Sequence, residues 1–243
     1  MQIRSILAAG LVALAAVPGG AGAKSDTTHL LNQGSAAFKA GNYKEAFRLW
    51  SAGARQGDPE AAYNLGLLYL NGQGVKQDDA AAAGQFMIGA IVDKADSQCN
   101  LGLLYLTGRG VRQDDVTAFN WISRAAEKGN AACQFSLGLM YDLGKAVATD
   151  KAKAIEWYRK SAENGYGAAQ YNLGVQYANG DDVALDYVAG YKWISLAAAN
   201  PKADDEAREK ATGARDELAA TLTPEQLAEA KAEIAAWKPA AGH

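Results

Sequence analysis

A period of 36 residues organises the middle of the chain and constrains its fold more than any other feature. The dipeptide Leu-Gly recurs at this spacing, and columns of Tyr, Val and Asp follow it in the same register. The Leu-Gly pairs are Leu65-Gly66, Leu101-Gly102, Leu137-Gly138 and Leu173-Gly174. A fixed period of this length is typical of repeat proteins, in which each unit packs only against its neighbours.

Each repeat unit is predicted to form two helices. In the first full-length copy of the repeat, four residues recur at i, i+3, i+4 and i+7 and so share one helical face: Ala62, Leu65, Gly66 and Tyr69. Gly72 and Gly74 end this helix, and Asp78 or Asp79 caps the next one by accepting free backbone N–H groups. No stretch of the sequence alternates as a half-buried strand does. The sequence therefore predicts an all-α solenoid of helix-turn-helix repeats.

Residues 201–243 leave the period and are predicted to form a C-terminal helical cap. Pro201 ends the last repeat, and the segment Thr223-Pro224-Glu225-Gln226 has the residue types of a helix start with a capping box. Ile234 and Trp237 then share one apolar face of the last helix. A solenoid needs such a cap because its last repeat otherwise exposes a core face.

The repeat columns resemble the Sel1-like repeat, a relative of the tetratricopeptide repeat. The first copy has Gln85 in place of the tryptophan of that pattern, and the third and fourth copies have Ala146 and Asp182 where the second loop glycine is expected. The predicted organisation is a signal peptide at 1–23, a Sel1-like/tetratricopeptide-like solenoid at 24–200 and capping helices with a tail at 201–243. Within the solenoid we expect a short unit at about 28–57 and full units at about 60–93, 96–129, 132–165 and 168–200.

The first 23 residues have the pattern of a cleavable signal peptide. Arg4 supplies a positive start, an apolar stretch runs from Ser5 to Val17, and Ala21-Gly22-Ala23 provides small residues at a cleavage site. The stretch is shorter than the roughly 20 residues that span a bilayer, although an uncleaved anchor or a buried helix is the alternative. The signal predicts export, and the resemblance to periplasmic bacterial members of the family implies the periplasm.

Composition excludes several classes of chemistry. The chain has 24 Lys and Arg against 27 Asp and Glu, so it lacks the basic footprint of a nucleic-acid-binding protein. Its two His and two Cys are too few for a zinc site of the usual kind, and a Ser-His-Asp triad would need one of those two His. The Ser-x-x-Lys and Lys-Thr-Gly motifs of β-lactam hydrolysis are absent from the sequence. We therefore expect no catalytic residue, no metal site and no cofactor.

The first helices of the repeats give a stronger indication of function than any catalytic or metal-binding motif in the sequence. In tetratricopeptide-like solenoids these helices line the concave surface, and the resemblance implies the same here. The side chains expected to form a peptide-binding groove on that surface are Tyr63, Asn64, Asn100, Phe135, Tyr171 and Asn172. Aromatic rings would bury apolar area, while amides would hydrogen-bond a peptide backbone. The alternative is that this arc packs between neighbouring repeats.

Cys99 and Cys133 lie in the first helices of adjacent repeats. An oxidising compartment would favour a disulfide between them, which would staple the two repeats together. Alternatively, Cys133 is only a small buried residue, because the same repeat position holds Ala61 and Ser97 in other units.

The best functional interpretation is a non-catalytic periplasmic adaptor that binds a protein or peptide of unknown identity in the groove. Such a scaffold would regulate an envelope signalling or assembly system, as a monomer, without nucleic acid and without a membrane span in its mature chain. One alternative is an enzyme or enzyme subunit acting on cell-wall material or β-lactams. Another is a structural envelope protein that associates with itself through its acidic cap.

The signal pattern predicts that the mature protein starts at Lys24, or within about two residues of it, because cleavage follows the small residues at Ala21 and Ala23. The intact mass of the exported protein measures this directly. A full-length species retained in the membrane would contradict both the cleavage and the export.

Overall fold

The computed structural model describes residues 21–240, all of whose regular elements are helices. The helices are α1 (Ala21–Lys39), α2 (Tyr43–Arg55), α3 (Pro59–Asn71), α4 (Asp79–Ile91), α5 (Ala95–Thr107), α6 (Asp115–Glu127), α7 (Ala131–Leu143), α8 (Lys151–Glu163), α9 (Gly167–Asn179), α10 (Tyr187–Ala198), α11 (Asp205–Ala219) and α12 (Pro224–Ala236). The prediction of an all-α chain of helix pairs is confirmed. Most of the predicted signal peptide, residues 1–20, lies outside the described residues.

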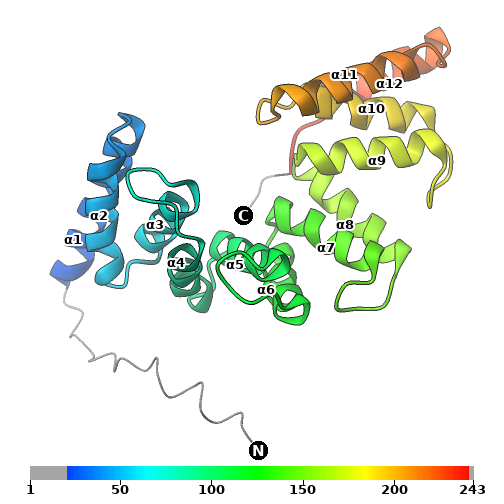
Figure 1. Cartoon of the computed structure of the whole chain (residues 1–243). Helices are drawn as coiled ribbons and strands as arrows, with labels where there is room; N and C mark the ends of the chain where they lie inside the picture. Colours follow the sequence, from blue (N-terminus) through cyan, green and yellow to red (C-terminus); the bar gives the residue numbers. More distant parts are fainter. Residues whose placement is uncertain (1–20, 241–243) are drawn as a thin grey trace, which may run out of the picture. The chain divides into compact units, whose positions relative to one another are not determined.

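The chain divides into two compact units. The first unit ends at Gln77 and contains α1 to α3, in which α2 packs against both other helices. The second unit begins at Asp78, and each helix from α4 to α10 packs against the next one along the chain (Figure 1). The last helix, α12, packs against α10.

Helix ends are set by aspartate and glycine, as the sequence predicted. The second helices are capped by carboxylates that accept backbone N–H groups of the first turn: Asp78, Asp114, Asp150 and Asp186. The first helices end at glycines in the left-handed conformation, with φ between 66° and 73°: Gly72, Gly108, Gly144 and Gly180. Because both signals are local, the first helix of each full repeat keeps the same bounds, and the second helix begins at the same repeat position.

The repeat glycine lets the two helices of a repeat approach each other closely. A Cβ added at Gly102 would lie 2.7 Å from the Ile122 side chain, and one at Gly174 would lie 2.6 Å from that of Ile194. Both isoleucines are almost fully buried. Any larger residue in the glycine column would therefore push the paired helices apart.

The loop after α5 packs against the backbone at the start of α4. At Gly110, where φ is 68°, an added Cβ would lie 2.2 Å from the carbonyl carbon of Asp79. The equivalent residues of the next two loops, Ala146 and Asp182, keep the left-handed backbone with φ of 62° and 58°. These departures from the family pattern thus retain the loop geometry, at a cost of about 1–2 kcal/mol each.

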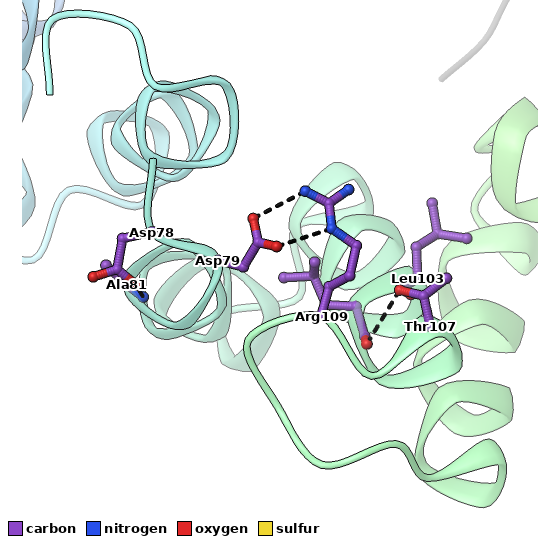
Figure 2. Close-up of polar contacts among 7 residues, drawn as sticks. Asp78, Asp79, Ala81, Leu103, Thr107 and Arg109 are labelled. Carbon is purple, nitrogen blue, oxygen red and sulfur yellow. Dashed lines mark hydrogen bonds and ion pairs between the residues drawn. The ribbon is translucent and has the colours of Figure 1, made fainter. Parts of the chain in front are cut away.

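Figure 2 shows an ion pair between the same loop and α4. Arg109 donates from Nε and Nη2 to the two carboxylate oxygens of Asp79, each at 2.9 Å. The neighbouring Asp78 instead accepts the Ala81 N–H at 2.9 Å and caps α4. The adjacent acids therefore have separate structural roles, one as a helix cap and the other as the partner of an arginine.

Two columns of side chains link successive repeats by hydrogen bonds to backbone carbonyls. Buried glutamines donate to the last turn of the preceding helix: Gln98 to Ala90, Gln134 to Ala126 and Gln170 to Ala162. Side chains at the end of the second helices donate to the carbonyl of a residue 35 positions earlier: Lys128 to Asp93, Asn164 to Gly129 and Asn200 to Gly165. We call the second set the carbonyl ladder. Both sets connect a side-chain donor to a backbone carbonyl at, or just after, the end of a helix.

The C-terminal helices cover the last repeat, as expected of a cap. Thr223 and Gln226 form a capping box at the start of α12, with each side chain accepting the backbone N–H of the other residue. Ile234 and Trp237 pack against the core of the last repeat. The backbone N–H of Ala240 donates to the carbonyl of Glu163 at 2.9 Å, which ties the tail to the end of α8.

Cys99 on α5 and Cys133 on α7 are joined in the structure, with their Cα atoms 5.6 Å apart. This separation lies within the range that a disulfide requires. Both residues are buried, at 4% and 0% exposure. The geometry is therefore compatible with the disulfide suggested by the sequence, which would link two adjacent repeats.

We predict that mature exported protein contains no free thiol and that reduction lowers its free energy of unfolding by about 3–4 kcal/mol, the chain-entropy value for a loop of this length. Denaturant unfolding of oxidised and reduced protein, with thiol labelling of the unfolded chain, measures both quantities. The double variant C99A/C133A is the control, because its stability should not respond to reductant. Two labelled thiols in unreduced protein would contradict the staple.

Asp93 connects the turn between α4 and α5 to α6 of the next repeat. Its carboxylate pairs with Lys128 and Arg124 and accepts a hydrogen bond from Gln98 at 2.9 Å. The hydrogen bonds from Lys128 and Gln98 lower the pKa of Asp93 from 3.8 to about 2. The folded state therefore favours the ionised carboxylate.

Because the pKa of Asp93 is depressed on folding, its stabilising effect is complete above its ordinary value of 3.8 and is lost as the pH falls towards 2. We expect the stability of the wild-type protein to fall more steeply across this window than that of the Asp93→Asn variant. Denaturant unfolding of both proteins at several pH values between 5 and about 2 measures the difference. Parallel pH profiles would show that the carboxylate contributes nothing.

Candidate functional site

The predicted groove residues all lie on the first helices of their repeats and are half-buried. They are spread over α3, α5, α7 and α9: Tyr63, Asn64, Asn100, Phe135, Tyr171 and Asn172. The structure brings three of them together in one pocket of about 500 Å³ in the second unit: Phe135, Tyr171 and Asn172. The walls of this pocket come from α7, α9, the connection after α10 and α11. We call it the α9 pocket.

Phe135 forms an aromatic wall of the α9 pocket. Its ring centroid lies 5.4 Å from that of Tyr158 and 5.5 Å from that of Tyr166. Tyr158 is buried and donates from its hydroxyl to Asp142 at 3.3 Å. Burial, together with the nearby Asp142 charge, raises the pKa of Tyr158, so the hydroxyl remains a donor. These contacts hold the Phe135 ring in a fixed position.

Tyr171 lies between the repeats and the cap. Its ring packs against small residues of α10 and α11, among them Ala197 and Ala211. The ammonium group of Lys210 on α11 lies 4.8 Å from the centroid of the ring. The position of Tyr171 therefore depends on α11, because that helix supplies both the close alanine contact and the cation.

Asn172 has a side-chain amide that makes no hydrogen bond to any described residue, namely residues 21–240. The other two asparagines of the pocket are already used within the fold. Asn164 donates to Gln134 at 2.8 Å, and Asn200 donates to Gly165 at 3.0 Å while accepting the backbone N–H of Lys202. The Asn172 amide is thus available to pair with a ligand.

Asn100 occupies the repeat position of Asn172 but does not line the α9 pocket. Its side-chain amide donates to the carbonyl of Asp96, one turn earlier in α5, at 3.0 Å. Ser136, at the same position of the next repeat, bonds the carbonyl of Ala132 in the same way, at 2.9 Å. These two middle repeats therefore use their polar groups inside their own helices.

The remaining predicted residues belong to the first unit. Asn64 lines a separate pocket of about 240 Å³ together with Phe38 and Leu67. Tyr63 is half-buried on α3 and does not line that pocket. Of the six predicted residues, three therefore line the α9 pocket and one lines a pocket of the first unit, whereas Tyr63 and Asn100 line neither.

Sequence reasoning missed the contribution of α11 to the α9 pocket. Ala207, Lys210 and Ala211 all line it. A signal was present, because Ala207, Ala211 and Ala214 recur at i, i+4 and i+7 and give α11 a face of small residues. Such a face permits close approach to a neighbouring helix, but its partner helix cannot be found from a segment outside the repeat period.

In the described part of the chain, one acidic residue lines the α9 pocket, and it has a structural role. Among the residues that line the α9 pocket, Asp204 is the one acid, and its carboxylate caps α11 by accepting the Ala207 N–H at 2.8 Å. No three His, Cys, Asp or Glu side chains of residues 21–240 gather as a metal site requires. Over the same residues, no helix combines the length and apolar character needed to cross a bilayer.

A protein-family model, the Sel1 repeat, matches the chain five times. The matched segments are residues 29–58, 59–84, 95–130, 131–166 and 167–201. They cover more than half of the chain and place a repeat over the short first unit as well as over the four regular ones. No curated protein matches the chain.

Several solved structures have a similar fold, including one described as a Sel1 repeat protein and one described as displaying an SLR fold. A protective antigen of uropathogenic Escherichia coli strains, described as displaying an SLR fold, is 33% identical with a TM-score of 0.65, covering 73% of this chain and 39% of that one. A Sel1 repeat protein from Oxalobacter formigenes is 28% identical with a TM-score of 0.63, covering 70% of this chain and 68% of that one. An immunity protein from Pseudomonas aeruginosa, 17% identical over 79% of this chain and 81% of its own with a TM-score of 0.52, shares the fold. This chain therefore corresponds to well under half of the first of these relatives.

Proposed function

The chain belongs to the Sel1 repeat family, and from this premise we propose that it binds an extended peptide segment of another protein in the α9 pocket. Sel1 repeat proteins are in general protein-interaction scaffolds, and their fold is typically non-catalytic. We further propose that this chain acts as an adaptor in the periplasm, where it regulates an envelope signalling or assembly system. The signal-like pattern before Lys24 supports export, and the resemblance to periplasmic bacterial members of the family favours the periplasm.

The observation that carries the proposal is the unpaired amide of Asn172 beside two aromatic side chains. A side-chain amide offers both a donor and an acceptor, which matches the N–H and C=O of a peptide group. Phe135 and Tyr171 provide apolar area for a side chain of the bound segment. Together they would bind a peptide through its backbone and one apolar anchor, without strong demands on sequence.

A measurement of catalytic turnover distinguishes the proposed peptide-binding function from the enzymatic alternative. Purified mature protein should not hydrolyse peptidoglycan fragments or β-lactams, and it should retain a protein partner. The partner can be identified by placing a photocrosslinking residue at Ala168, an exposed position on the rim of the α9 pocket, in intact cells. Mass spectrometry of the crosslinked product then supplies the segment for binding measurements.

We predict that Tyr171→Ala weakens binding of that segment by about 1–3 kcal/mol, a factor of roughly 5 to 150, because aromatic anchors carry much of the affinity of an interface. Asn172→Ala should cost about 0.5–1.5 kcal/mol, the worth of one neutral hydrogen bond. Isothermal titration calorimetry measures both changes. The matched control is Asn100→Ala, whose amide is occupied within α5 and whose loss should leave the affinity unchanged.

Melting curves must accompany these affinities, since Tyr171 also packs against α11 and its loss can loosen the cap. Folded Tyr171→Ala and Asn172→Ala proteins that bind the crosslinked segment as tightly as the wild type would refute the α9 pocket as the binding site.

A further inference from the structure

We propose that the first unit holds a second, independent binding subsite between α1 and α3, which takes one apolar side chain and one neighbouring peptide group of an extended segment. This subsite goes beyond the α9 pocket, because it uses different residues in a different unit of the chain. Its hydrogen-bonding residue is Asn64.

The walls of the subsite are apolar. The pocket has a volume of about 240 Å³, and Phe38 from α1 and Leu67 from α3 line it together with Trp50 from α2. The rings of Phe38 and Trp50 lie with their centroids 5.6 Å apart, and Trp50 is only 4% exposed. These side chains form a preformed wall for an apolar group.

The polar groups of the subsite divide into used and available ones. Trp50 donates from its indole N–H to the carbonyl of Leu31 at 3.3 Å, and the hydroxyl of Ser35 donates to the same carbonyl at 2.9 Å. The side-chain amides of Asn64 and Asn71 make no hydrogen bond to any residue in the described range 21–240. Asn64 is half-buried, so its amide faces a ligand with less competition from water than the exposed Asn71.

Size and charge define the class of ligand. The pocket volume of about 240 Å³ is smaller than the roughly 300 Å³ of the smallest typical small-molecule and cofactor sites. It suits a single amino-acid side chain. Lys39 is the one charged residue among those that line the pocket. A basic side chain would be repelled by Lys39, whereas a neutral aliphatic side chain would fill the apolar wall while its own peptide group pairs with Asn64.

Titration of the mature protein with N-acetyl-leucine N-methylamide, followed by NMR of the side-chain amides, tests the subsite. This probe carries one aliphatic side chain between two peptide groups. The Asn64 amide signals should shift saturably, and Asn64→Ala should weaken binding at this site about 2- to 10-fold, as judged from neighbouring backbone signals. The matched control Asn100→Ala should bind the probe as the wild type does, and N-acetyl-lysine N-methylamide should bind more weakly than the leucine probe.

Unshifted Asn64 signals, an Asn64→Ala variant that binds normally, or equal binding of the lysine probe would each overturn the proposal. The same titration on the Tyr171→Ala/Asn172→Ala double variant separates the two sites. A response at Asn64 that persists in this variant supports an independent subsite, whatever happens at the α9 pocket. A response at Asn64 that disappears in it would overturn independence.

Discussion

The close contact between the paired helices of a repeat, at the repeat glycine, is the constraint on which the rest of the second unit depends. At Gly102 and Gly174 the partner isoleucine occupies the space that a Cβ would need. Contact at this distance fixes where the paired helices cross, and the same close approach recurs 36 residues apart at Gly102, Gly138 and Gly174. This repeated contact helps to position α7 and α9, two of the helices that line the α9 pocket.

The fold was predictable because its signals are local. An aspartate before a helix and a glycine after one act within a single turn, so Asp78 and Gly72 could be assigned from the sequence. The buried glutamine column was not predictable, because a glutamine such as Gln98 is typical of a surface position until its carbonyl partner on the preceding helix is known. The role of α11 escaped prediction for a related reason: it lies outside the period, so its neighbours cannot be inferred from register.

The sequence predicted the helical face on which the candidate site lies, but it did not predict which side chains of that face are available to a ligand. Periodicity places Asn64, Asn100 and Asn172 at one repeat position, but it cannot tell which amide is free. That depends on side-chain rotation, since an asparagine in a helix can bond the carbonyl of the preceding turn, as Asn100 does. Three residues at the same repeat position therefore differ in what they can offer a ligand: the amides of Asn64 and Asn172 are available, whereas the amide of Asn100 is used inside α5.

The carbonyl ladder has a consequence for how such a chain changes its length. Its acceptors are backbone atoms, and its donors, Lys128, Asn164 and Asn200, differ in side-chain type while reaching the equivalent carbonyl of the repeat before. An acceptor that every residue carries makes no demand on the sequence of the neighbouring unit. A repeat with lysine or asparagine at this position, gained by duplication or lost by deletion, would therefore find its donor and acceptor in place, so the number of such repeats can vary without redesign of these hydrogen bonds.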